Sequence, residues 1–164
     1  MKVKALMAAF AIAMPIAAVA QNAAKPATPD MRAAFATIEK NVAAIAFKPE
    51  KERWQANVDL WKVRLENLGK LSTAEFKKME PIFTVMEENV SHLVEPQEKE
   101  RWVANHGLWQ VAMAMSGLPA DAEAAKVRAM MTAMQANVAR VEAGEEKQRW
   151  TANIVLWKGL FDKK

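Results

Sequence analysis

The residues best suited to bind a ligand in this chain are tryptophan, asparagine and arginine, and they recur at a fixed interval. The six tryptophans form two series with steps of 48 residues, and asparagine and arginine follow the same period. Aromatic walls with a few polar groups are typical of a small-molecule pocket. The sequence therefore names twelve candidate ligand-binding residues: Trp54, Asn57, Trp61, Trp102, Asn105, Trp109, Trp150, Asn153, Trp157, Arg53, Arg101 and Arg149.

The same twelve residues also suit a packed core. At roughly 100° per residue on a helix, Arg53 and Asn57 fall inside or beside the apolar arc that holds Trp54 and Trp61. Buried polar groups are costly unless they are hydrogen-bonded, and in a helix seam they can fix alignment. We expect Asn41 and Asn57 to bond across a helical hairpin or to nearby backbone. We expect Arg53 to cap a carbonyl or pair with an acid, with its stem on a tryptophan.

Methionine suggests metal chemistry as an alternative, because thioether sulfur suits Cu(I). The chain holds 11 methionines, but several occupy repeat positions where other copies carry Ile or Phe, and methionine fills core gaps readily. His106 matches Val58 and Ile154 in the other copies, so we expect it to be partly buried. We predict no metal site, with a weak alternative set of Met86, Met131, Met134 and His106.

Catalytic motifs are missing from the sequence. It contains no C-x-x-C-H, H-E-x-x-H or G-x-S-x-G motif and no glycine-rich phosphate loop. Catalytic sites also tend to break internal symmetry, because different roles need different residues. We therefore predict that the protein is not an enzyme and holds no cofactor.

The elements that position the candidates are repeated units of 48 residues. Each unit reads as two helices, since apolar residues recur at spacings of three and four, as in Met31, Ala34 and Ile38. The predicted units are 31–70, 73–117 and 121–164. Ten positions are identical in all three copies, and in the first copy they are Asn41, Val42, Glu50, Lys51, Arg53, Trp54, Ala56, Asn57, Leu60 and Trp61.

Local signals mark where the helices begin. Pro49 and Pro96 suit the first position of a helix, where the missing N–H costs nothing. Ser72 and Glu75 have the spacing of a capping box, and Gly117 and Pro119 mark the joint before the third unit. The predicted fold is all-α, with three hairpins in a compact bundle or a short α-solenoid. Only a closed bundle would bring the three copies of the candidate residues together.

The N-terminal segment reads as a secretory signal. Lys2 and Lys4 precede an apolar run, and small residues end at Ala20, so we expect cleavage there. Residues 21–30 are expected to form a flexible linker and residues 31–164 a single domain. The formal net charge of +4 falls to +2 when the two signal lysines are removed, which disfavours nucleic acid as a partner. We expect no membrane span after cleavage.

These observations favour a periplasmic or secreted helical-repeat protein that works by binding. Its ligand or partner would be an unknown small molecule or protein, held by the repeated tryptophan, asparagine and arginine. One alternative is a periplasmic carrier of copper or another metal that uses methionine. The other is a purely structural or self-assembling protein, and a homo-oligomer is compatible with all three.

Overall fold

The structure is a computed structural model that describes residues 26–114 and 121–161. The predicted signal segment and residues 21–25 of the predicted linker lie outside these residues, as do Gly117 and Pro119. The described chain forms six α-helices, which confirms the predicted all-α class. They are α1 (Pro29–Ala43), α2 (Lys48–Glu66), α3 (Thr73–Ser91), α4 (Pro96–Ala114), α5 (Asp121–Ala139) and α6 (Glu145–Phe161).

The helix starts follow the expected local chemistry. Thr28 caps α1 by accepting a hydrogen bond from the backbone N–H of Met31. Ser72 and Glu75 form the predicted capping box at the start of α3. The predicted proline starts are also confirmed, since Pro49 lies in the first turn of α2 and Pro96 opens α4.

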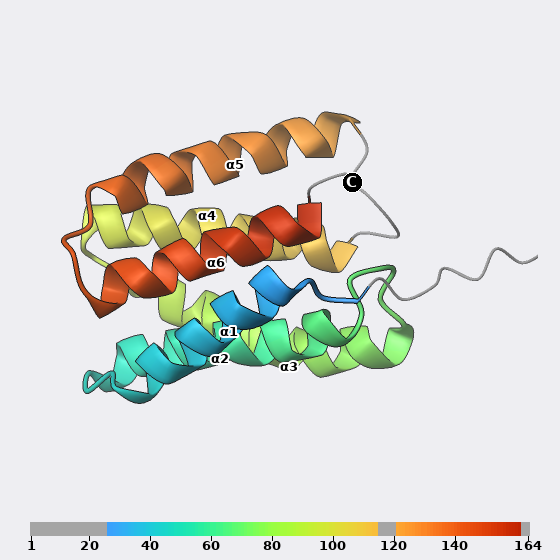
Figure 1. The fold of residues 1–164 in the computed structure, drawn as a ribbon, viewed down its shortest axis with the longest axis horizontal. Coiled ribbons are helices and arrows are strands. Elements are labelled where there is room, and N and C mark those ends of the chain that lie inside the picture. The colour runs from blue at the N-terminus through green and yellow to red at the C-terminus, as the bar shows by residue number, and fades with distance from the viewer. Residues whose placement is uncertain (1–25, 115–120, 162–164) are drawn as a thin grey trace, which may run out of the picture.

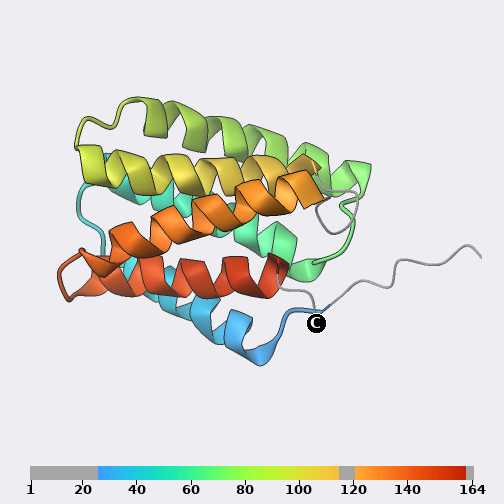
Figure 2. The same ribbon diagram turned by 90° about the horizontal axis from the view of Figure 1, so that it is seen from above.

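The six helices form a closed bundle with approximate threefold symmetry (Figure 1). The helices α2, α4 and α6 surround the axis, and each outer helix packs against two of them. The contact of α1 with α6 closes the ring. The turns after α1, α3 and α5 gather at one end, as Figure 2 shows. The closed bundle, rather than the open solenoid, is therefore the arrangement adopted.

The two helices of each predicted hairpin are in contact, which confirms the three hairpins, but the closest helix pairs join different units. The tightest packing joins α2 to α3, α4 to α5 and α6 to α1, whereas α1 and α2 of the first unit approach less closely. Each outer helix thus lies mainly along the inner helix of the preceding unit. The units are interlocked around the ring, and the α6–α1 pair repeats the others without a connecting loop.

The core contains the predicted apolar stripes together with one residue that we did not predict. Met31, Ile38 and Val42 of α1 are buried, as expected. Arg64 is also fully buried, and its guanidinium donates to the backbone carbonyls of Asn67, Leu68 and Gly69 at the end of α2. Burial lowers the pKa of Arg64 to about 10.

Within the described residues, no helix has both the length and the apolar character needed to cross a membrane.

Candidate functional site

The six tryptophans form two layers of three around the bundle axis. Each layer takes one ring from α2, one from α4 and one from α6. Ring centroids lie 4.8 to 5.0 Å apart in the layer of Trp54, Trp102 and Trp150. They lie 4.6 to 4.7 Å apart in the layer of Trp61 and its two copies. Rings this close are in direct contact, which leaves no room for a ligand between them.

Between these layers, Asn57, Asn105 and Asn153 form a cyclic set of hydrogen bonds. The Nδ2 atom of Asn57 donates to Asn153 at 3.1 Å, Asn153 donates to Asn105 at 2.8 Å, and Asn105 donates to Asn57 at 3.0 Å. Each Oδ1 atom also accepts from the indole Nε1 of a tryptophan in the second layer at 2.9 Å. Both lone pairs of each amide oxygen are therefore used.

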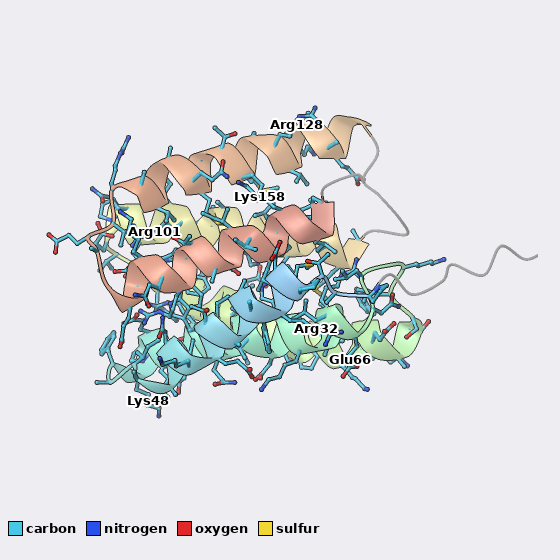
Figure 3. The ribbon with its side chains drawn as sticks, viewed as in Figure 1. Arg32, Lys48, Glu66, Arg101, Arg128 and Lys158 are labelled. Atoms are coloured by element: carbon cyan, nitrogen blue, oxygen red, sulfur yellow. The ribbon has the colours of Figure 1, made fainter. Side chains whose placement is uncertain are left out.

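The three repeated arginines form a second ring nearer the end where the turns gather. Arg53 pairs with Glu98 at 2.5 Å, Arg101 with Glu146 at 2.7 Å, and Arg149 with Glu50 at 2.5 Å. Figure 3 shows Arg101 toward this end, as it does Lys48 at the start of α2. The expected pairing of Arg53 with an acid is confirmed. Each ion pair joins two different inner helices, so the ring of pairs links the three units.

Each arginine also lies against a tryptophan of another unit. The guanidinium carbon of Arg53 is 5.9 Å from the ring centroid of Trp102, and the other two copies are at 5.8 and 5.4 Å. The guanidinium therefore makes a cation–π contact with the ring. In all three copies Nε is buried without a hydrogen-bond partner among the described residues. Arg101 and Arg149 bond through both Nη atoms, and Arg53 bonds through Nη2.

Burial shifts the pKa of one acid that pairs with this arginine ring. Glu50 has a raised pKa because burial disfavours its charged form. Arg149 opposes the rise, and the neighbouring acids Glu146 and Glu98 add to it. Charges from the other two units therefore act on the Glu50 carboxyl.

Within the described residues, the outer asparagines make no side-chain hydrogen bond across their own hairpins, but the expected alternative, a bond to nearby backbone, occurs at Asn89, which donates to the carbonyl of Val85. We expected Asn41 and Asn57 to face each other across a hairpin, but Asn41 Nδ2 donates to Gln148 of α6 at 3.0 Å. Asn137 accepts from Arg101 of α4, and Asn89 donates only to Val85 of its own helix. The predicted Asn41–Asn57 pair is wrong because α1 lies along α6 rather than along α2.

The twelve predicted ligand-binding residues thus meet on the bundle axis, where they contact one another and do not surround a pocket. All six tryptophans are at most 1% exposed, and the three inner asparagines are 0% exposed. The three arginines are buried as well. Their polar atoms bond across the unit boundaries, so this geometry favours the packing interpretation of the set over a pocket on the axis.

The weak metal candidates also lie mostly inside the bundle. Met86 and Met134 are fully buried, and Met131 is partly buried against the core. The sulfur of Met86 lies 3.8 Å from the amide nitrogen of Asn105. Among the described residues, histidines and acids form no group of three suited to a metal ion.

His106 is partly buried, as predicted. It stacks on Phe83 with a centroid distance of 4.6 Å, and its Nε2 atom is 3.6 Å from Oε1 of Glu87. Burial lowers its pKa, and the acid Glu87 opposes this shift. The other units carry Val58 and Ile154 here, so the histidine places a titratable group at a core position of one unit only.

Open hollows lie on the outside of the bundle, at two equivalent places. The α1/α6 groove has a volume of about 740 Å³ and is lined by Asp30, Ala33, Ala34, Thr37, Ala143, Gly144, Lys147, Gln148, Thr151, Ala152 and Val155. The α4/α5 groove has a volume of about 750 Å³ and is lined by Pro96, Lys99, Glu100, Val103, Ala104, His106, Gly107, Gln110, Ala129, Met130 and Ala133. Nearly every lining position of one groove matches a position of the other under the 48-residue repeat, so both are built by the same part of the unit.

The grooves were not predicted from the sequence. The candidate residues were those identical in the three units, whereas the grooves are lined mainly by positions that vary, with Ala152 and Lys147 as exceptions in the α1/α6 groove. The available signal was a set of small outward residues, such as Ala33 and Thr37 in α1 and Ala129 and Ala133 in α5. The corresponding α3 positions are the larger Pro81 and Val85, which distinguishes the third face of the bundle.

Comparison of this chain with protein-family models, with curated proteins and with solved structures finds no match.

Proposed function

We propose that this protein is an exported, non-catalytic binding protein that holds its partner in the grooves on its outer surface. The repeated tryptophan, asparagine and arginine residues then provide the rigid framework that fixes the shape of these grooves. The proposal keeps the binding role expected from the sequence. It moves the contact surface from the axis to the outside of the bundle.

One observation carries this proposal, which is that the two grooves occur at equivalent places in different units. Each lies between a tightly packed inner and outer helix, and each has a floor of small side chains such as Ala34, Ala152 and Ala104. Concave, mostly apolar surfaces with a few polar groups at the edge suit ligand or peptide binding. Lys147, Gln148, Lys99 and Glu100 supply such edge groups.

A role as a metal carrier has less support from the geometry. The two fully buried candidate methionines, Met86 and Met134, contact other core groups and would need the bundle to open before a metal could reach them. Cu(I) ligation by thioethers requires several sulfur atoms around one point.

Native mass spectrometry of the mature protein from its exported fraction tests the proposal. We expect added mass that is released on denaturation. The groove-filling variant Ala34→Ile/Thr37→Val should lose or weaken this species. These substitutions copy residues Ile82 and Val85 of α3, so the same fold already accepts them at the equivalent positions.

The matched control is Val85→Thr, which copies Thr37 onto α3 and leaves both grooves unchanged. It should retain the added mass. If both variants retain it, the α1/α6 groove does not hold the partner, and the proposal that both grooves bind it is wrong. A bare wild-type protein would assign the repeats a purely structural role.

A further inference from the structure

The third face of the bundle carries apolar side chains, two of them well exposed, at the positions that line the grooves of the other two faces, and we call them the α3 ridge. The α3 ridge consists of Pro81, Ile82 and Val85, with Phe47 from the turn before α2. These residues match Ala33, Ala34, Thr37 and Ala143 of the α1/α6 groove under the repeat. Phe47 is 64% exposed and Val85 is 46% exposed. Exposed large apolar side chains that cluster on one face mark a contact surface.

The charges beside the ridge and the α1/α6 groove are of opposite sign. Exposed Lys48 and Lys78 flank the ridge, although Lys48 also lies 3.6 Å from Glu52. Exposed Asp30, Glu142 and Glu145 flank the groove. The one lysine of the groove, Lys147, is engaged by the backbone carbonyls of Ala139 and Val141.

The α4/α5 groove has a different charge pattern. Asp30 of the α1/α6 groove corresponds to exposed Lys126 in α5, and the other two charged residues of the α4/α5 groove, Lys99 and Glu100, are of opposite sign to each other. A ridge flanked by Lys48 and Lys78 would therefore meet a like charge there. Charge complementarity selects the α1/α6 groove.

We propose that the α3 ridge of one copy of this protein docks into the α1/α6 groove of a second copy. Val85 and Ile82 fill the hollow over Ala33, Ala34 and Thr37, while Lys78 and Lys48 approach the acids at the two ends of the groove. This inference rests on the proposed function, because it gives one of the two grooves an occupant. The α4/α5 groove stays open in the assembly.

The contact joins two different surfaces, so it is heterologous. Each docked copy still presents a free ridge or a free groove, and the assembly grows into a ring or a filament rather than stopping at a symmetric dimer. Association therefore depends on protein concentration and continues past two copies.

Sedimentation velocity of the mature wild-type protein, from about 1 µM to about 1 mM, tests the inference because weak interfaces have dissociation constants in this range. The mean mass should rise with concentration beyond twice the monomer. Val85→Glu on the ridge and Thr37→Glu in the groove should each remain monomeric. Ala133→Glu, at the position of Thr37 in the α4/α5 groove, is the matched control and should associate like the wild type. Far-UV circular dichroism establishes that each variant is folded.

Mixing the two monomeric variants gives the most specific result. The Thr37→Glu copy keeps an intact ridge and the Val85→Glu copy keeps an intact groove, so an equimolar mixture should form a one-to-one dimer that does not grow. A wild type that stays monomeric, or a mixture that stays monomeric, overturns this inference. Neither of these two sedimentation results affects the added mass expected in native mass spectrometry. The groove proposal is therefore tested independently of self-association.

Discussion

The indole Nε1 of Trp109 donates a 2.9 Å hydrogen bond to Oδ1 of Asn57, which lies 52 residues earlier in the chain. The same oxygen accepts from Asn105, whose own oxygen accepts from Trp157. Each unit therefore supplies donors to one neighbour and acceptors to another. Because the groups are fully buried, an unmatched register would leave polar atoms without partners, and that penalty favours the closed arrangement.

Replacing a member of this ring should destabilise the protein strongly. The variant Asn105→Leu leaves Trp157 Nε1 and Asn153 Nδ2 without their acceptor and removes one donor from Asn57. Each unsatisfied buried group costs about 1–3 kcal/mol, so we expect a total loss of about 3–5 kcal/mol. Urea denaturation followed by far-UV circular dichroism measures this loss.

Asn89 provides the control for that prediction. It is also identical in all three units, but its amide bonds only to the carbonyl of Val85 in the same helix, at a partly exposed site. Asn89→Ala should change stability by less than about 1 kcal/mol. If Asn105→Leu and Asn89→Ala lost similar amounts of stability, membership of the axial ring would not explain the energetic importance of Asn105.

The arginine ring should show coupling between units. Arg101→Met removes the ion pair with Glu146, the bond to Asn137 and the contact with Trp150. We expect a loss of about 2–3 kcal/mol, below the range for fully buried pairs because Glu146 is partly exposed.

The double variant Arg101→Met/Glu146→Gln should lose less than the sum of the two single variants, as a double-mutant cycle would measure. The surface pair of Lys62 and Glu39 is the comparison, and its coupling should be about 0.5 kcal/mol or less. If the stability losses at Arg101 and Glu146 were additive, the ion pair would have no coupling energy, and the prediction would be wrong.

Acid should destabilise the protein through His106. Burial lowers the pKa of this imidazole, so the folded state binds its proton less readily than the unfolded state. The resulting stability is fully present above the unfolded pKa of about 6.5 and is lost as pH falls through the lower folded pKa. His106→Val copies Val58 of the first unit, and its free energy of unfolding should fall less than that of the wild type between pH 7 and pH 5. Parallel pH profiles would refute this assignment.

The seam between α1 and α6 should be sensitive to one added methyl group. A Cβ atom at Gly159 would lie 2.5 Å from the sulfur and 2.6 Å from Cγ of Met31. Gly159→Ala should therefore destabilise by about 1–3 kcal/mol, despite the higher helix propensity of alanine. Met31→Val copies Val127 of the third unit and should restore part of the loss in the double variant. Thermal unfolding measures both effects, and a more stable Gly159→Ala protein would contradict the tight packing.

Helix positions and core stripes could be predicted from the sequence, because they depend on local periodicity and on residues such as Pro96 and Ser72. The choice of neighbours around the axis could not. Packing α1 along α2 or along α6 buries the same side of Met31 and Ile38. The apolar pattern therefore does not predict which helix packs against α1. The observed arrangement also pairs polar groups of different units, as in the bond from Asn41 to Gln148.

The site was harder to predict for the same reason. Identity among the units marked Trp54, Asn57 and Arg53, but symmetry selects residues that units use to hold one another. A contact surface needs one unit to differ, and the differences are ordinary residues such as Thr37 and Val85. Arg64 illustrates the limit as well, since a charged residue on a helix is usually exposed unless carbonyls such as those of Leu68 and Gly69 surround it.

The packing of α1 against α6 fixes the number of repeats in a way that a linear array does not. An open stack can gain or lose a unit at either end and keep its remaining interfaces. Here a duplication would have to enlarge two layers of touching indole rings into four-membered layers with a hole at the centre. A deletion would leave each remaining asparagine without one of its neighbours. The number of repeats therefore cannot change without loss of the axial packing, and sequence variation is confined to the outward residues of each unit.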